Sequence, residues 1–266
     1  GYEHRTQSNN SLIFWNKPPK EELKYFFETM DKGGKGEPGI VNGQTMKKRA
    51  PWAEGLNPCF EILLPASGGT CNLVTIDLGK FKGDTYGLHR AAKLIARANY
   101  RQTCVDFNDG ILQEQWDLNN KHLRLCGTSL MGIVKREDMK AYDYQRLERI
   151  ITSAANGMAD ELDSPHPKNV TAIKPEGTIS KMFDTTEGHT KPMSKYVFNN
   201  IAFSLYDPLV NILKEAGYRV FHHPFDESAM LVTLPTSYDD VQFETVNGLE
   251  VNTETAIEQL ERYKML

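Results

Sequence analysis

The sequence predicts an α/β protein in which the strands pair mainly in parallel. Short apolar or β-branched runs alternate with long amphipathic segments along the 266 residues, and this alternation is typical of strands joined by helices. One segment breaks the alternation: residues 51–64 read as extended and irregular, with Pro58 in their middle and Pro65 just after them. No repeat or linker divides the chain, so we treat residues 1–266 as one piece of a fold.

The helices and strands are predicted from apolar spacing and from capping residues. Asp207 followed by Pro208 is a typical helix start, with Asp207 as N-cap and Pro208 in the first turn. Helices are expected at Lys20–Met30, Tyr86–Val105, Tyr142–Leu162 and Asp207–Ala216, and an amphipathic helical pattern closes the chain at Glu254–Leu266. Strands are expected at Ser11–Phe14, Leu73–Leu78, Leu123–Val134, Val170–Ile173, Tyr218–Phe221 and Met230–Leu234. Neither end has the signature of a domain boundary, so we expect a piece of a larger fold.

Composition narrows the classes of function. The net charge of −4 and the pI of 6.0 give no basic excess for nucleic acid or a membrane surface. No apolar run reaches the roughly 18 residues of a membrane span, and the first residues lack a signal-peptide core. Four cysteines do not make a disulfide framework in a chain of this length. We expect a cytoplasmic protein, and the seven histidines show no spacing for a metal site.

Residues 57–61 carry the most chemistry. Pro58 favours an extended Asn57, and in an extended segment Asn57, Cys59 and Glu61 point to one side. Phe60 and Ile62 then face the other way, into packing. An amide can fix a hydroxyl, a carboxylate can take its proton, and a thiol can act as nucleophile or radical. The structural alternative is a strand edge with one buried cysteine and no catalytic role. This pattern alone favours neither the catalytic nor the structural interpretation.

The other three cysteines divide by context. Cys71 follows the turn Ser67–Gly69 and returns toward Cys59 if that turn joins two extended segments. It is then either a second redox-active thiol or a cysteine at the start of a strand without a role. Cys104 and Cys126 lack patterned charged neighbours, so we expect both to be inert packing residues.

The turn Pro175-Glu176-Gly177-Thr178-Ile179-Ser180 follows the short β-branched run at Val170–Ile173. A strand that ends in a glycine-containing turn and opens a helix directs free backbone N–H groups at an anion, and hydroxyls add donors. A plain strand–turn–helix is the structural alternative. The sequence alone favours that alternative.

Several of these segments together resemble the catalytic subunit of ribonucleotide reductases. Asn57-Pro58-Cys59-Phe60-Glu61, followed by Cys71-Asn72-Leu73, is similar to the family's finger loop and the segment after it. Four further stretches match in the same order: Gln7–Ser11, Gly36–Gly39, Thr171–Ser180 and Asp207–Val210. The resemblance covers nearly the whole chain and is strongest to the adenosylcobalamin-dependent (class II) ribonucleoside-triphosphate reductases.

The resemblance implies a role for each matching residue. Cys59 would become the thiyl radical that takes the 3′-hydrogen of the ribose, and Glu61 would be the base for the 3′-hydroxyl. Asn57 would hydrogen-bond substrate hydroxyls, and Cys71 would be half of the dithiol that reduces the 2′-carbon. Position 60 is often small in the family and is phenylalanine here, so we expect altered packing there.

For the turn, the resemblance implies that Pro175, Glu176, Gly177, Thr178, Ile179 and Ser180 bind the substrate phosphates. Glu176 should then point away from the ligand. For the fold, the resemblance implies part of a ten-stranded α/β barrel with a central finger loop. The implied cofactor is adenosylcobalamin.

The implied partners are a ribonucleotide substrate, complementary N- and C-terminal segments of the reductase, and a thioredoxin-like reductant. One alternative is a split-protein segment that only docks its complementary pieces and has no activity alone. A Cys/His hydrolase is a weaker alternative, because no histidine has a motif that ties it to Cys59.

Overall fold

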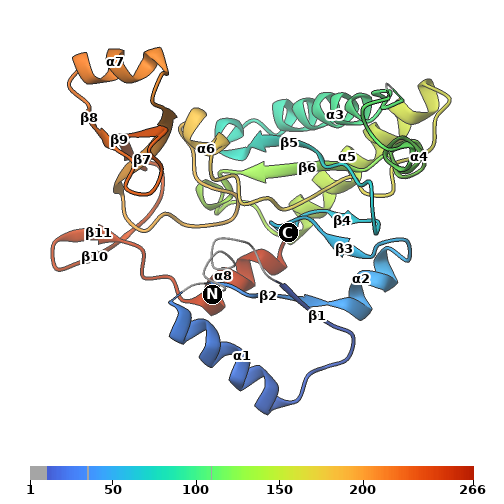
Figure 1. Ribbon diagram of the computed structural model, residues 1–266, viewed down its shortest axis with the longest axis horizontal. Helices are drawn as coiled ribbons and strands as arrows, with labels where there is room; N and C mark the ends of the chain where they lie inside the picture. Colours follow the sequence, from blue (N-terminus) through green and yellow to red (C-terminus); the bar gives the residue numbers. More distant parts are fainter. Residues whose placement is uncertain (1–10, 35, 109) are drawn as a thin grey trace. The chain divides into compact units, whose positions relative to one another are not determined.

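The structure is a computed structural model that describes residues 11–34, 36–108 and 110–266 (Figure 1). The chain divides into two compact units, each described by itself. The first unit contains residues up to Ile76 together with Tyr86–Ser129 and Arg146–Lys174, and the second contains Asp77–Thr85, Leu130–Gln145 and Pro175–Leu266. Of the stretches that carry the resemblance, residues 7–10 lie outside the described part of the chain.

The first unit begins with strands β1 (Ser11–Phe14) and β2 (Gly39–Asn42), which pair in parallel across helix α1 (Lys20–Gly33). Helix α2 (Gly43–Arg49) begins at Asn42, whose side chain accepts the backbone N–H of Thr45. Strands β3 (Gly55–Leu56) and β4 (Leu63–Leu64) form a short hairpin. The predicted β1 and α1 are confirmed, whereas α2 was not predicted.

Helices α3 (Thr85–Gln102) and α5 (Ala141–Glu161) border the two-stranded sheet of β5 (Asn72–Asp77) and β6 (Cys126–Met131). The Asn99 side chain of α3 joins the two strands, because its Nδ2 donates to the Asn72 carbonyl at 2.8 Å and its Oδ1 accepts from the Gly127 amide at 3.0 Å. Tyr100, Cys126, Met158 and Ala159 form a buried cluster that links α3, β6 and α5. Helix α4 (Glu114–Leu123) precedes β6 and was not predicted.

The second unit is built on the antiparallel sheet β7-β9-β8, formed by Tyr196–Ser204, Ala229–Ser237 and Arg219–His222. Helix α7 (Pro208–Glu215) is capped by Asp207, which accepts from the Leu209 amide at 2.9 Å, as predicted. A second hairpin, β10 (Glu244–Val246) with β11 (Leu249–Val251), precedes α8 (Ala256–Lys264). The remaining elements are two 3₁₀ turns, Leu78–Phe81 and Ile133–Lys135, and the short helix α6 (Ile179–Met182).

The α/β class is confirmed, but the expected dominance of parallel pairing is wrong. Among the five strand pairs whose register the structure describes, β1 with β2 is parallel and the other four are antiparallel. The physical reason is that β3–β4 and β10–β11 are joined by connections too short for a crossover. Val170–Ile173 is also not a strand. It lies beside β6 and forms one isolated parallel bridge with it, between Thr171 and Thr128.

Candidate active site

A tight turn at residues 57–62 holds Asn57, Cys59 and Glu61, three of the predicted catalytic residues, at the tip of the β3–β4 hairpin. The Asn57 amide donates to the Ile62 carbonyl at 3.2 Å, and the Phe60 amide donates to the Asn57 carbonyl at 3.0 Å. The Oδ1 atom of Asn57 accepts the Ile62 amide at 3.0 Å. The expected extended conformation is therefore wrong here, because the chain reverses direction between Asn57 and Ile62.

Two apolar side chains anchor this turn in the first unit. Phe60 has a φ of 66° and packs with the cluster formed by Val41, Met46, Ala50 and Ala53. Ile62 is fully buried and packs with Leu123, Leu125 and Ala172. The prediction that both side chains face into packing is confirmed, although the turn rather than strand alternation produces it. The bulky residue at position 60 thus has a packing role.

Glycines make room for both anchors. A Cβ on Gly39 would lie 2.3 Å from the Cζ atom of Phe60. A Cβ on Gly127 would lie 2.5 Å from Leu73 Cδ2 and 2.9 Å from Ile62 Cδ1. Strands β2 and β6 therefore approach the turn closely only because these positions have no side chain.

The structure brings Cys59, Glu61 and Cys71 within electrostatic range of one another. Both thiols are exposed at the surface of the described chain. Partial burial raises the pKa of Cys59 above its ordinary value of 9.0, the Glu61 carboxylate raises it further, and the Lys174 ammonium opposes both. Partial burial likewise raises the pKa of Cys71, followed by the charges of Glu61 and Cys59. Both cysteines are therefore thiols at neutral pH.

Glu61 carries a buried oxygen that lacks a donor. Its Oε2 atom has no hydrogen-bond partner among the residues that the structure describes. A buried polar atom without a partner is costly and requires an explanation. A substrate hydroxyl placed between Glu61 and the two thiols would supply the missing donor.

Lys174 is the residue whose part in this site the sequence reasoning missed. Its backbone amide donates to the hydroxyl of the buried Ser129 at 3.0 Å, which fixes the chain where it leaves the edge of β6. The ammonium group acts on the pKa of Cys59. The available signal was its position directly before the Pro175–Ser180 turn, within a segment that carries the resemblance.

Cys104 and Cys126 differ from the two site thiols and from each other. Cys126 is fully buried, and desolvation together with the charge of Cys104 raises its pKa to about 12. It packs in the core, as predicted. Cys104 lies beyond the end of α3 and is exposed, so the expectation that it packs inside is wrong. Its thiol donates to the Tyr100 carbonyl at 3.7 Å.

The Pro175–Ser180 turn lies in the second unit and leads into α6. The backbone amides of Gly177, Thr178 and Ile179 have no acceptor in the described parts of the chain, and Gly177 and Thr178 are exposed. Ser180 is fully buried, and its hydroxyl donates to the Gly177 carbonyl at 3.4 Å. Glu176 is buried, with a φ of 61°. The turn thus offers amides and the Thr178 hydroxyl to an anion, whereas the Ser180 hydroxyl is engaged within the turn.

Two further features of the described residues bear on the kind of site. Within residues 11–34, 36–108 and 110–266, no three His, Cys, Asp or Glu side chains are arranged to hold a metal ion. No helix in this part of the chain combines the length and apolar character needed to cross a bilayer.

No family model matches the chain, but curated relatives and a solved structure do. The adenosylcobalamin-dependent ribonucleoside-triphosphate reductase of Levilactobacillus brevis is 25% identical over 283 residues, which cover 88% of this chain and 36% of the relative. The reductase of the same name from Lacticaseibacillus paracasei is 25% identical over 299 residues, which cover 96% and 39%.

The fold agrees with these relatives. A crystal structure of a B12-dependent (class II) ribonucleotide reductase matches with a TM-score of 0.69 and 24% identity, over 88% of this chain and 37% of that one. The chain thus spans a little over a third of the length of the proteins it matches. Sequence and fold together show that this chain is homologous to a part of the adenosylcobalamin-dependent ribonucleoside-triphosphate reductases.

Proposed function

We propose that this chain is the radical-bearing part of an enzyme that reduces ribonucleotides to deoxyribonucleotides. The observation that carries the proposal is the turn at residues 57–62, which holds the Cys59 thiol and a buried Glu61 oxygen without a donor, both within electrostatic range of the Cys71 thiol. The similarity to reductases over 88% of the chain supports it. The matching residues are those that the resemblance ties to hydrogen abstraction, proton removal and reduction.

In this proposal Cys59, as a thiyl radical, takes the 3′-hydrogen of the ribose, and Glu61 takes the proton of the 3′-hydroxyl. A base placed this way contributes roughly 10²–10⁴-fold to the rate. The Asn57 Oδ1 atom closes the turn, which leaves its Nδ2 group to donate to a substrate hydroxyl. The 2′-hydroxyl leaves as water, and Cys59 returns the hydrogen to C3′.

Cys71 and a partner thiol supply two electrons and two protons and form a disulfide; one proton leaves in the water formed from the 2′-hydroxyl, and the other goes with the electrons to C2′. A thioredoxin-like protein would then reduce that disulfide. In the family that the chain resembles, the partner thiol lies upstream of the finger loop, so we expect it from a complementary segment of the reductase. Within this chain Cys126 is buried, and Cys59 must stay free for hydrogen abstraction.

The substrate's phosphates would lie on the Pro175–Ser180 turn. Free amides at Gly177, Thr178 and Ile179 are suited to phosphate oxygens. Because the Ser180 hydroxyl is engaged with Gly177, we expect it to hold the turn's shape, while Thr178 contacts the ligand.

The relatives' name supplies the cofactor of the proposal, adenosylcobalamin. When bound, that group would generate the radical that removes the hydrogen atom of a thiol. Cys59 fits the receiving end of this step because its thiol is exposed and protonated. We assign no residue of this chain to holding the corrin ring.

The proposed architecture is the family's ten-stranded α/β barrel, to which residues 1–266 would contribute a central-to-late portion. Residues 57–64 would be the finger loop at its centre. Complementary N- and C-terminal segments would complete the barrel and cover the exposed apolar side chains, which include Phe27, Leu94 and Ile111.

Assembly with those segments tests the enzyme against the docking-only alternative. The chain, alone and combined with complementary segments, is incubated with ribonucleoside triphosphate, adenosylcobalamin and a dithiol. We expect deoxynucleotide formation only in the assembled sample. An assembled complex that binds nucleotide but makes no product would leave the docking module as the function of this chain.

A further inference from the structure

Helix α3 carries a concentration of positive charge that the proposed reaction does not use. Between Thr85 and Gln102 it has four cations, Arg90, Lys93, Arg97 and Arg101, and no acidic residue, in a chain whose net charge is −4. Their spacing of three or four residues places them on one stripe of about 16 Å along the helix. This stripe is therefore a local region of positive charge on a chain that is negatively charged as a whole.

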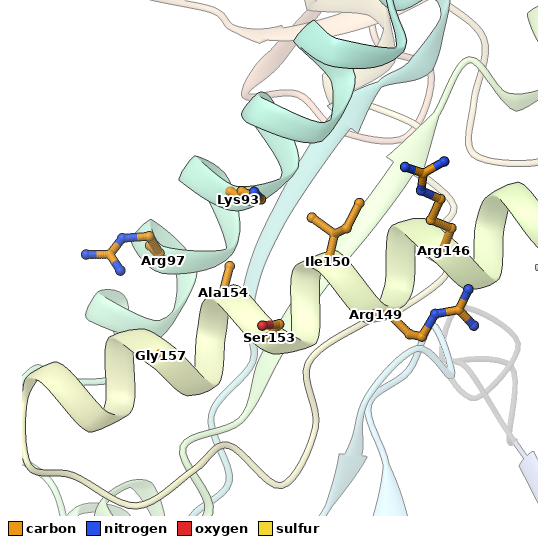
Figure 2. Close-up of a pocket in the computed structure, with 8 residues that line it drawn as sticks. All are labelled: Lys93, Arg97, Arg146, Arg149, Ile150, Ser153, Ala154 and Gly157. Atoms are coloured by element: carbon orange, nitrogen blue, oxygen red, sulfur yellow. The ribbon is translucent and has the colours of Figure 1, made fainter.

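Helix α5 adds cations across a shallow groove of about 530 Å³ that lies between the two helices (Figure 2). Lys93 and Arg97 line it from α3, and Arg146 and Arg149 line it from α5. The groove also contains Ile150, Ser153, Ala154 and Gly157. Desolvation lowers the pKa of the neighbouring His89, and the charges of Arg146 and Lys93 lower it further.

Most of these cations have no internal partner. Arg97 is held by Glu161 through two hydrogen bonds of 2.7 and 2.6 Å. No ion pair engages the other five, Arg90, Lys93, Arg101, Arg146 and Arg149, within the part of the chain that the structure describes. The stripe's charge is thus available to an external partner.

The shape of the groove argues against a small anion. Arg146 and Arg149 project from opposite sides of α5 (Figure 2), and Arg97 is engaged by Glu161. The cations therefore follow the length of the helices and do not converge on one point. A compact phosphate would reach only one or two of them.

The groove's apolar part argues for a helix. Ile150 and Ala154 extend from α5 toward α3 (Figure 2), and the small residues Ala154 and Gly157 permit a close approach. Arginine is enriched where proteins dock, and complementary charge steers the encounter.

We propose that the groove between α3 and α5 binds an amphipathic acidic helix of a partner protein. Its apolar residues would lie on Ile150, Ala154 and Gly157, and its carboxylates, one turn apart, would pair with the cations of α3 and α5. This site is separate from the Cys59 turn and does not depend on the proposed reaction.

Binding of a synthetic helix tests the proposal. The probe is a fluorescent peptide of about five turns with leucines on one face and glutamates beside them, and anisotropy reports its binding to the 266-residue chain. The test variant is Lys93→Glu with Arg146→Glu. The matched control is Lys48→Glu with Arg49→Glu, which makes the same charge change at two exposed residues of α2 that have no ion pair in the described chain.

We expect the test variant to weaken binding at least about tenfold and the control to leave it nearly unchanged. Equal losses in the two variants would show that net charge alone attracts the peptide and would overturn the site. So would the absence of binding to the unaltered chain. Full displacement by inorganic tripolyphosphate or by a single-stranded oligonucleotide of equal charge would also overturn it, in favour of a general anion surface.

Discussion

The Oδ1 atom of Asn57 accepts a hydrogen bond of 3.0 Å from the backbone amide of Ile62, across the turn that carries Cys59 and Glu61. This bond joins the proposed substrate-binding amide to the residue that anchors the turn in the core, because Ile62 is fully buried. The Oδ1 atom of Asn57 therefore stabilises the turn. In our proposal, its Nδ2 group donates a hydrogen bond to the substrate.

Asn57→Ala should lower the free energy of unfolding by about 1 kcal/mol, because the Ile62 amide loses its side-chain acceptor. Asn57→Asp keeps an acceptor oxygen and should retain most of the stability. Denaturant unfolding of the two variants measures the difference. Equal stability of Asn57→Ala and the unaltered chain would mean that the bond does not support the turn.

Glu61→Gln should make both site thiols react faster with iodoacetamide at a fixed mildly alkaline pH. The carboxylate raises the pKa of Cys59 and of Cys71, so its neutral replacement moves both pKa values down and increases the thiolate fraction. Alkylation rates across a pH series, resolved by peptide, measure the shift. The matched control is Glu54→Gln, whose carboxylate pairs with Lys47; an equal shift there would contradict a local effect of Glu61.

Cys126 should make stability fall in alkaline solution. Its pKa is about 12 in the folded chain against an ordinary 9.0, so the folded state holds the proton more tightly. The contribution is complete below about pH 9 and is lost as the pH rises toward 12. Cys126→Ala should remove this part of the pH dependence. Unfolding curves at about pH 8 and pH 10 test it, and equal losses in variant and unaltered chain would refute the assignment.

Cys71 should form a disulfide during turnover with a cysteine from outside this chain. A disulfide requires Cα atoms within about 7 Å, so the complementary segment must lie beside the Gly68–Cys71 turn. The chain alone should show four free thiols under mild oxidation. Peptide mapping after a single turnover without reductant would reveal the partner. A bond from Cys71 to Cys104 or Cys126 would contradict the prediction that the partner cysteine lies outside this chain.

Local signals in the sequence predicted the fold better than global ones did. Asp207 and Pro208 placed the start of α7 correctly, because a cap and a first-turn proline act within one helical turn. The Asn247–Gly248 pair at the tip of β10–β11, with φ values of 52° and 80°, was an overlooked hairpin signal. The error on parallel pairing arose in part because two of the antiparallel pairs, β3–β4 and β10–β11, are short hairpins whose turns were not recognised.

The site shows the same division. The sequence identified Cys59, Glu61 and Cys71, and the structure places them near one another. The sequence did not reveal the turn, because Pro58 favours an extended conformation at Asn57. The reversal of the chain depends instead on the Asn57 side chain and on Phe60 at positive φ. Lys174 escaped notice because its effect on Cys59 crosses more than a hundred residues of sequence.

The radical role of Cys59 is tested most directly by Cys59→Ser in the chain assembled with its complementary segments. A hydroxyl hydrogen is much harder to abstract than a thiol hydrogen, while the side chain keeps nearly the same size. Deoxynucleotide formation and nucleotide binding are measured on the same preparation. We predict no product above background with binding nearly intact; substantial deoxynucleotide formation by this variant would contradict the assignment.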